Sequence, residues 1–119
     1  MKPGDSLQQI ELEILEFVRV REWEQYHDAK NLCMAISVEA GELAAVLRWV
    51  SNDEANAVVE QPDIRRRLAA EIADIGILLL ELCHRTGIPF TDAIREKLMT
   101  NEINYPVDSS RGSAERRSE

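Results

Sequence analysis

The sequence predicts an all-α fold, a four-helix unit that assembles as a dimer or a dimer of dimers. The chain has 119 residues, which suits one compact domain. Only 5 glycines and 4 prolines occur, and most lie outside the stretches in which apolar residues repeat. Those repeats follow helical rather than alternating spacing, and helix start and stop signals flank them.

The first two predicted helices lie in the N-terminal half. Ser6 begins a capping box, and an apolar stripe follows to about Arg21. A short aromatic segment, 23–27, has no clear period. Asp28 then caps a second helix that runs to about Val50.

The C-terminal half contains the other two predicted helices. After a polar connection at 51–61, Pro62 suits the first position of a third helix that ends at Gly87. Between positions 72 and 82 this helix is apolar almost all round, so we expect a second subunit to cover one of its faces. Thr91 is expected to cap a fourth helix that ends before Pro106. The domain is therefore placed at 1–106, and 107–119 is expected to be a mobile tail.

Charge and composition restrict the partners. A formal net charge of −8 argues against nucleic acid and anionic membranes, both of which need a basic protein face. We expect no secretory signal, because residues 1–13 lack an apolar core segment, and no apolar run approaches the length needed to span a bilayer. Cys33 and Cys83 lie in apolar helical segments and are expected to be buried, reduced thiols of a cytoplasmic protein.

Two carboxylate pairs are the most informative feature. Glu39 and Glu42 interrupt the otherwise uncharged stretch 31–47, and Glu71 and Asp74 precede the uncharged run 75–80. Residues three apart share a helix face, so each pair points both carboxylates the same way. Carboxylates among apolar residues are costly unless they are paired or bind metal.

The spacing of the pairs also predicts that they meet. If the second and third helices form an antiparallel hairpin, each pair lies about 12 Å from its end of the connection. Four carboxylates at one level make an all-oxygen site for Mg²⁺ or Mn²⁺. The alternative is that the acids pair with Arg48 or with the arginines at 65–67, or face solvent.

With these motifs the sequence resembles the MazG-like all-α nucleoside triphosphate pyrophosphohydrolases, most closely their dCTP pyrophosphatase branch. The resemblance extends from about Ser6 to Ala114. It includes the E-x-x-E and E-x-x-D motifs, the segment 23–27 (WEQYH), the segment 30–32 (KNL), Trp49, Lys97, Asn101 and the Tyr105-Pro106 pair.

The resemblance implies Mg²⁺-dependent hydrolysis of a nucleoside triphosphate to the monophosphate and pyrophosphate, with dCTP or a related pyrimidine nucleotide as substrate. The metal would be held by Glu39, Glu42, Glu71 and Asp74, and either Glu39 or Glu42 would act as the catalytic general base. The implied substrate-binding residues are Trp23, Tyr26, His27, Lys30, Trp49, Lys97, Asn101 and Tyr105. The implied assembly is a homodimer or homotetramer.

Three other interpretations remain open. The base preference could differ, towards dUTP or modified nucleotides. A di-iron carboxylate protein would need two E-x-x-H motifs, and only Glu81-x-x-His84 is present. A non-enzymatic helical interaction module would have no need of four inward-facing acids.

Overall fold

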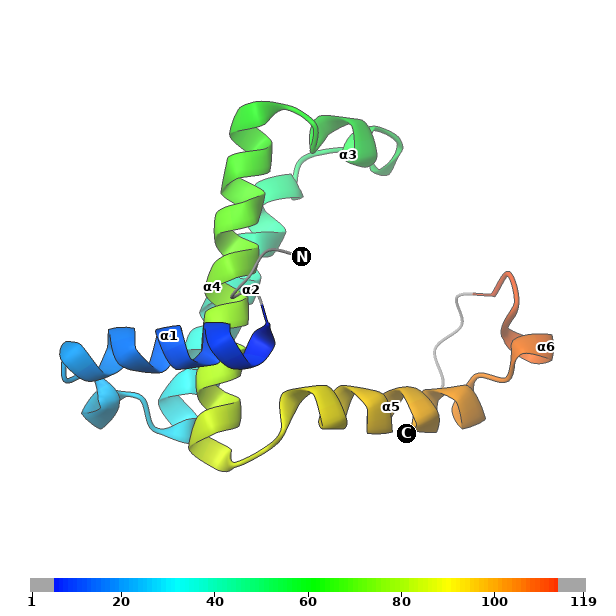
Figure 1. The fold of residues 1–119 in the computed structure, drawn as a ribbon. Helices are drawn as coiled ribbons and strands as arrows, with labels where there is room; N and C mark the ends of the chain where they lie inside the picture. The colour runs from blue at the N-terminus through cyan, green and yellow to red at the C-terminus, as the bar shows by residue number, and fades with distance from the viewer. Residues whose placement is uncertain (1–5, 114–119) are drawn as a thin grey trace. The chain divides into compact units, whose positions relative to one another are not determined.

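The computed structural model describes residues 6–113, and every regular element among them is helical. Contacts divide the chain after Gly87 into two compact units, 1–87 and 88–119. Figure 1 labels the helices of both units. The predicted all-α class is confirmed.

The first unit contains the three longer helices predicted for it and two short ones. They are α1 (Leu7–Val20), the 3₁₀ helix η1 (Glu24–Tyr26), α2 (Ala29–Leu47), α3 (Asn52–Val58) and α4 (Pro62–Thr86). The predicted Ser6 cap of α1 is confirmed, because its side chain accepts a hydrogen bond from the backbone N–H of Gln9. The connection at 51–61 contains the short helix α3.

Helices α2 and α4 form the hairpin on which the rest of the first unit is built, and α1 crosses α4 (Figure 1). The Asp28 side chain caps α2, Pro62 begins α4, and Gly87 ends α4 in the left-handed conformation with φ 73°. The apolar side chains buried between these helices are Val18, Leu32, Val46 and Leu80. This core fixes the register of α2 against α4.

Two predicted boundaries were wrong by a few residues. Helix α2 ends at Leu47 rather than near Val50, because the Val50 N–H bonds to the Leu47 carbonyl and forms a tighter final turn. The fourth long helix is not capped by Thr91. Its first helical bond runs from Ala93 N–H to the Pro89 carbonyl, so it begins at Phe90.

The second unit contains α5 (Phe90–Asn104) and α6 (Val107–Ser110). The segment expected to be a mobile tail therefore begins with one helical turn. Its last six residues, 114–119, lie outside the described residues, and the domain boundary at 106 stays a prediction. No helix between residues 6 and 113 combines the length and the apolar character needed to cross a bilayer.

Both cysteines are free thiols. Cys83 is partly buried, and burial raises the pKa of its thiol, as does the charge of Glu11 to a smaller extent. The expectation that Cys33 is buried was wrong. It lies on an exposed face of α2. The apolar residues of this helix do not mark its buried face clearly enough to show that Cys33 lies outside that face.

Candidate metal centre and aromatic segment

Three of the four predicted acids converge between α2 and α4. Glu39 from α2 and Glu71 and Asp74 from α4 each offer a carboxylate oxygen, and these oxygens lie within 4.8 Å of one another. We call these three residues the acid cluster. The hairpin brings them together because the two pairs are about equally distant in sequence from its connection. The expected common level of the pairs is thus present.

The electrostatics of the acid cluster centre on Glu71. The nearby carboxyl of Glu39 raises the pKa of Glu71 most, through a hydrogen bond that needs a shared proton. Desolvation and the charges of Glu39, Asp74 and Glu42 raise it further. Glu71 Oε2 is buried and has no hydrogen-bond partner among the described residues. Above this raised pKa, the cluster holds mutually repelling charges, and one of its buried oxygens lacks a donor among the described residues.

These properties fit a divalent cation. A buried carboxylate oxygen without a donor is an unusual feature in a folded protein, and a cation would satisfy it. The sequence alternative, pairing with arginine, finds no support within residues 6–113. Arg65 pairs with Glu60, Arg48 lies over the ring of Trp49, and no ion pair among the described residues involves the acid cluster. The residues present therefore suit Mg²⁺ or Mn²⁺, with oxygen ligands alone.

Glu42 lies outside the acid cluster but within its electrostatic reach. It is exposed on α2, one turn after Glu39. Of the neighbouring charges that raise the pKa of Glu71, that of Glu42 has the smallest effect. Glu42 is thus close to the cluster without sharing its tight oxygen group. This position suits a carboxylate that acts on a neighbouring water or ligand.

The aromatic segment at 23–27 lies between α1 and α2. The Trp23 ring packs edge-on against Phe17 of α1, with ring centroids 5.8 Å apart, and lies 6.2 Å from the ring of His27. Trp23 and Tyr26 are exposed. Three of the predicted substrate-binding residues are thus grouped on one short segment.

Trp49 is far from that segment within one chain. It follows the C-terminal end of α2, whereas Trp23, Tyr26 and His27 precede its N-terminal end. Helix α2 has 19 residues, so these ends are about 28 Å apart. Trp49 is 88% exposed, and the Arg48 guanidinium lies over its ring. A single copy of the first unit does not bring the two tryptophans together.

The remaining predicted ligands occupy two places. Lys30 is exposed in the first turn of α2. Lys97 and Asn101 lie one turn apart on α5, and Tyr105 follows its end; all three belong to the second unit. Helical spacing puts Lys97 and Asn101 on one face of α5.

Sequence reasoning missed one buried interaction. The sequence suggested Glu81 only as half of an E-x-x-H motif. In the described part of the chain, Glu81 and His84 do not belong to any group of side chains that could bind a metal ion. The Glu81 carboxylate oxygen is hydrogen-bonded to His27 Nδ1 instead, at 2.7 Å. The available signal was its position directly after the apolar run 75–80, the same signal that identified Glu71 and Asp74.

Comparisons with known proteins agree with this geometry. The sequence profile of the MazG-like family matches residues 34–119. The chain is 38% identical to dCTP pyrophosphatase 1 of Rattus norvegicus over 112 residues, 94% of this chain and 66% of the relative. It is 32% identical to the Homo sapiens protein of that name over 117 residues, 98% of this chain and 69% of the relative.

A solved structure has the same fold. A pyrophosphatase from Archaeoglobus fulgidus superposes with a TM-score of 0.78 at 34% identity, covering 89% of this chain and 98% of the other. The helical hairpin with its acid cluster is thus that of an all-α MazG-like protein. The chain belongs to the MazG-like family, and it spans about two thirds of the length of the curated relatives it matches.

Proposed function

We propose that this protein is a Mg²⁺-dependent nucleoside triphosphate pyrophosphohydrolase that converts dCTP, or a related pyrimidine nucleotide, to the monophosphate and pyrophosphate. The observation that carries the proposal is the acid cluster, in which a buried oxygen of Glu71 lacks a donor. The names of the relatives, dCTP pyrophosphatase 1 and a pyrophosphatase, support the reaction and the substrate class. Mn²⁺ would be a chemically reasonable substitute. The cytoplasm, where free thiols persist, is the proposed location.

The proposed chemistry divides the four acids by position. Glu39, Glu71 and Asp74 would hold the cation, with Glu42 at the edge of the set. A divalent cation bound there supplies charge neutralisation of the triphosphate and polarisation of the phosphoryl group. Of the two residues predicted as the catalytic general base, Glu42 is the better placed, because it lies outside the acid cluster and is exposed to water. Its carboxylate would orient the water that attacks the α-phosphorus and accept its proton.

The proposed nucleotide site needs a second copy of the chain. Trp23 and Trp49 lie at opposite ends of α2, so one pocket containing both must draw them from two copies. The apolar surface agrees with this, since the rest of the first unit leaves Met34 and Val38 of α2 and Ile72 of α4 exposed. We therefore propose a homodimer, alone or paired into a tetramer, in which Lys30, Lys97, Asn101 and Tyr105 complete the substrate contacts.

Product analysis tests the reaction. With dCTP and Mg²⁺, we expect dCMP and pyrophosphate in equal amounts, because attack at the α-phosphorus breaks the bond to the β-phosphate. Anion-exchange chromatography of the products distinguishes the possible cleavages. Formation of dCDP and orthophosphate would exclude the proposed attack. A parallel panel with dUTP, the other common nucleotides and 5-modified dCTP determines which base is preferred.

A further inference from the structure

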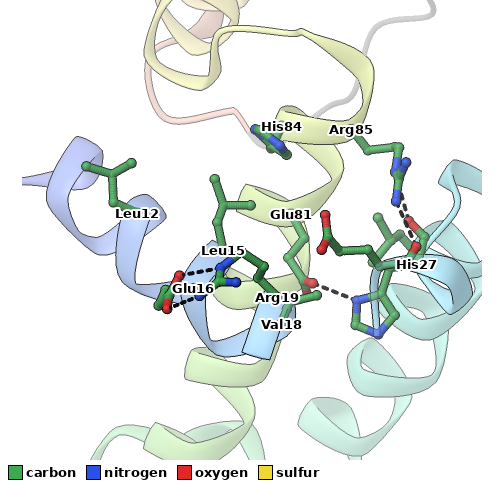
Figure 2. Close-up of a pocket in the computed structure, with 11 residues that line it drawn as sticks. Leu12, Leu15, Glu16, Val18, Arg19, His27, Glu81, His84 and Arg85 are labelled. Atoms are coloured by element: carbon green, nitrogen blue, oxygen red, sulfur yellow. Dashed lines mark hydrogen bonds and ion pairs between the residues drawn. The ribbon is translucent and has the colours of Figure 1, made fainter. Parts of the chain in front are cut away.

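Glu81 is a buried carboxylate that the proposed metal chemistry does not use. It is the only charged or polar side chain buried within residues 6–113, with 6% exposed. A carboxylate in such surroundings must be hydrogen-bonded to be tolerated. Its partner is Nδ1 of His27, 54 residues away in sequence (Figure 2). A buried pair at 2.7 Å between such distant residues holds the aromatic segment on α4.

Arg85 strengthens this attachment one helical turn later. Its Nε donates to the His27 carbonyl at 3.1 Å, and its Nη2 donates to the Glu24 carbonyl at 2.9 Å. Figure 2 shows both bonds beside the pair of Glu81 and His27. A three-residue 3₁₀ helix has little stability of its own. Helix α4 therefore fixes both the backbone of this segment and the ring of His27.

The contact determines which ring nitrogen of His27 is available to a ligand. An ionised carboxylate can only accept, so Nδ1 carries the proton in this bond. In the neutral imidazole, Nε2 is then a hydrogen-bond acceptor. Nε2 has no hydrogen-bond partner in the described part of the chain, and the side chain is 26% exposed. Glu81 thus fixes the tautomer and leaves one defined acceptor.

The position of this acceptor relative to the acid cluster suits a nucleotide. Glu81 follows Asp74 by seven residues on α4, which is about 10 Å along the axis on nearly the same face. A cavity of about 400 Å³ adjoins the pair and is lined by both His27 and Glu81. The Trp23 ring, four residues before His27 in the sequence, has its centroid 6.2 Å from that of the His27 ring. A nucleotide with its phosphates at the acids would extend its base towards this end of the hairpin.

We propose that Glu81 is a positioning residue that fixes the tautomer and orientation of His27, so that Nε2 accepts a hydrogen bond from the exocyclic amino group of the bound base. This inference rests on the proposed function and refines its substrate class. Cytosine and adenine carry such an amino group, whereas uracil and thymine present a keto oxygen, which cannot donate. Glu81 therefore favours amino-bearing over keto-bearing bases without touching the nucleotide.

Glu81→Gln tests the effect on substrate choice. The amide retains the shape of the side chain but can either donate to Nδ1 or accept from it, so the variant no longer enforces one tautomer and allows a proton on Nε2. We expect the ratio of kcat/KM for dCTP over dUTP to fall roughly tenfold, mainly through KM, as loss of one hydrogen bond implies. The matched control is Glu13→Gln, which removes an exposed carboxylate of α1 that does not line this cavity and should leave the ratio unchanged.

The second readout needs neither substrate nor turnover. In ¹⁵N NMR spectra of the substrate-free protein at about pH 8, where an ordinary imidazole is neutral, we expect protonated Nδ1 and unprotonated Nε2 for His27. The chain has 2 histidines, so a His84→Gln spectrum assigns the signals. In Glu81→Gln, the signals should shift towards the other tautomer. If that variant does not fold, His27→Ala should lower the same kcat/KM ratio.

The outcomes separate this inference from the proposed function. A fixed His27 tautomer in a protein that hydrolyses no nucleotide would contradict the function and the base contact but retain the positioning role. A protonated Nε2 in the wild type would overturn the inference even if dCTP is hydrolysed. So would a His27→Ala variant whose dCTP-to-dUTP ratio of kcat/KM equals that of the wild type, or a Glu81→Gln variant that keeps this ratio although its His27 tautomer has changed.

Discussion

Glu42→Gln is expected to lower kcat for pyrophosphate release by about 10²- to 10⁴-fold, the usual contribution of a general base. The amide has nearly the same shape as the carboxylate but cannot take a proton from water. Because Glu42 lies outside the acid cluster, KM and Mg²⁺ affinity should change far less than kcat. Steady-state kinetics at several Mg²⁺ concentrations measure all three quantities.

Glu13→Gln is the matched control, since Glu13 is an exposed acid on α1. It should behave as the wild type. If Glu42→Gln retains normal kcat, Glu42 is not the base, and Glu39 becomes the remaining predicted base. If instead Mg²⁺ affinity falls as strongly as kcat, Glu42 is a metal ligand like the members of the acid cluster.

The second large effect concerns a pocket shared between two chains. Trp23→Ala and Trp49→Ala should each lower kcat/KM. The loss should correspond to about 1–3 kcal/mol of activation free energy, the usual effect of losing one base-stacking contact. When the two variants are unfolded, mixed equally and refolded, activity should recover to about a quarter of the wild-type value. In a two-fold symmetric dimer, half of the molecules are mixed, and each has one pocket with both tryptophans intact.

A mixture of Trp23→Ala with Tyr26→Ala serves as the control for this recovery. Both substitutions lie on the same segment, so no mixed dimer contains an intact pocket, and activity should not increase. Absence of recovery in the first mixture would contradict a pocket formed by two chains. Wild-type kinetics in both single variants would show that the tryptophans do not contact the substrate.

The helices and the acid cluster were predictable from the sequence because local signals specify them. Caps at Ser6 and Asp28, Pro62 and Gly87 mark helix ends through backbone chemistry that does not depend on distant residues. The meeting of Glu39 with Glu71 followed from their equal distances to the hairpin connection. Thr91 misled because Pro89 already supplied the carbonyl that begins α5.

The contact of Glu81 with His27 was not predictable in this way. It joins residues 54 apart through the return of the 23–27 segment onto α4, and no periodicity encodes that return. The same limit applies to Trp49. Its motif placed it in one pocket with Trp23, whereas the length of α2 keeps the two apart in a single chain. Spacing along one helix is local information, and the meeting of distant segments is not.

Glu39, Glu71 and Asp74, with Glu42 at their edge, are proposed to form a cation site, and the effect of that site on stability can be measured without any substrate. The raised pKa of Glu71 means that the metal-free native state binds a proton more tightly than the unfolded chain does. Its stabilising contribution is present below the unfolded pKa and is lost as pH rises through the native pKa. At neutral pH, the metal-free protein is therefore held below its attainable stability by repulsion within the cluster.

Thermal melts of the wild type and Glu71→Gln at neutral pH, with and without millimolar Mg²⁺, test this claim most directly. Mg²⁺ at a hundredfold excess over Kd should stabilise the wild type by about 2.7 kcal/mol, a rise in Tm of roughly 10 °C. Metal-free Glu71→Gln should melt no lower than the metal-free wild type and should respond less to Mg²⁺. A wild type that ignores Mg²⁺, together with a Glu71→Gln variant that melts lower, would show instead that Glu71 is the partner of a protein cation.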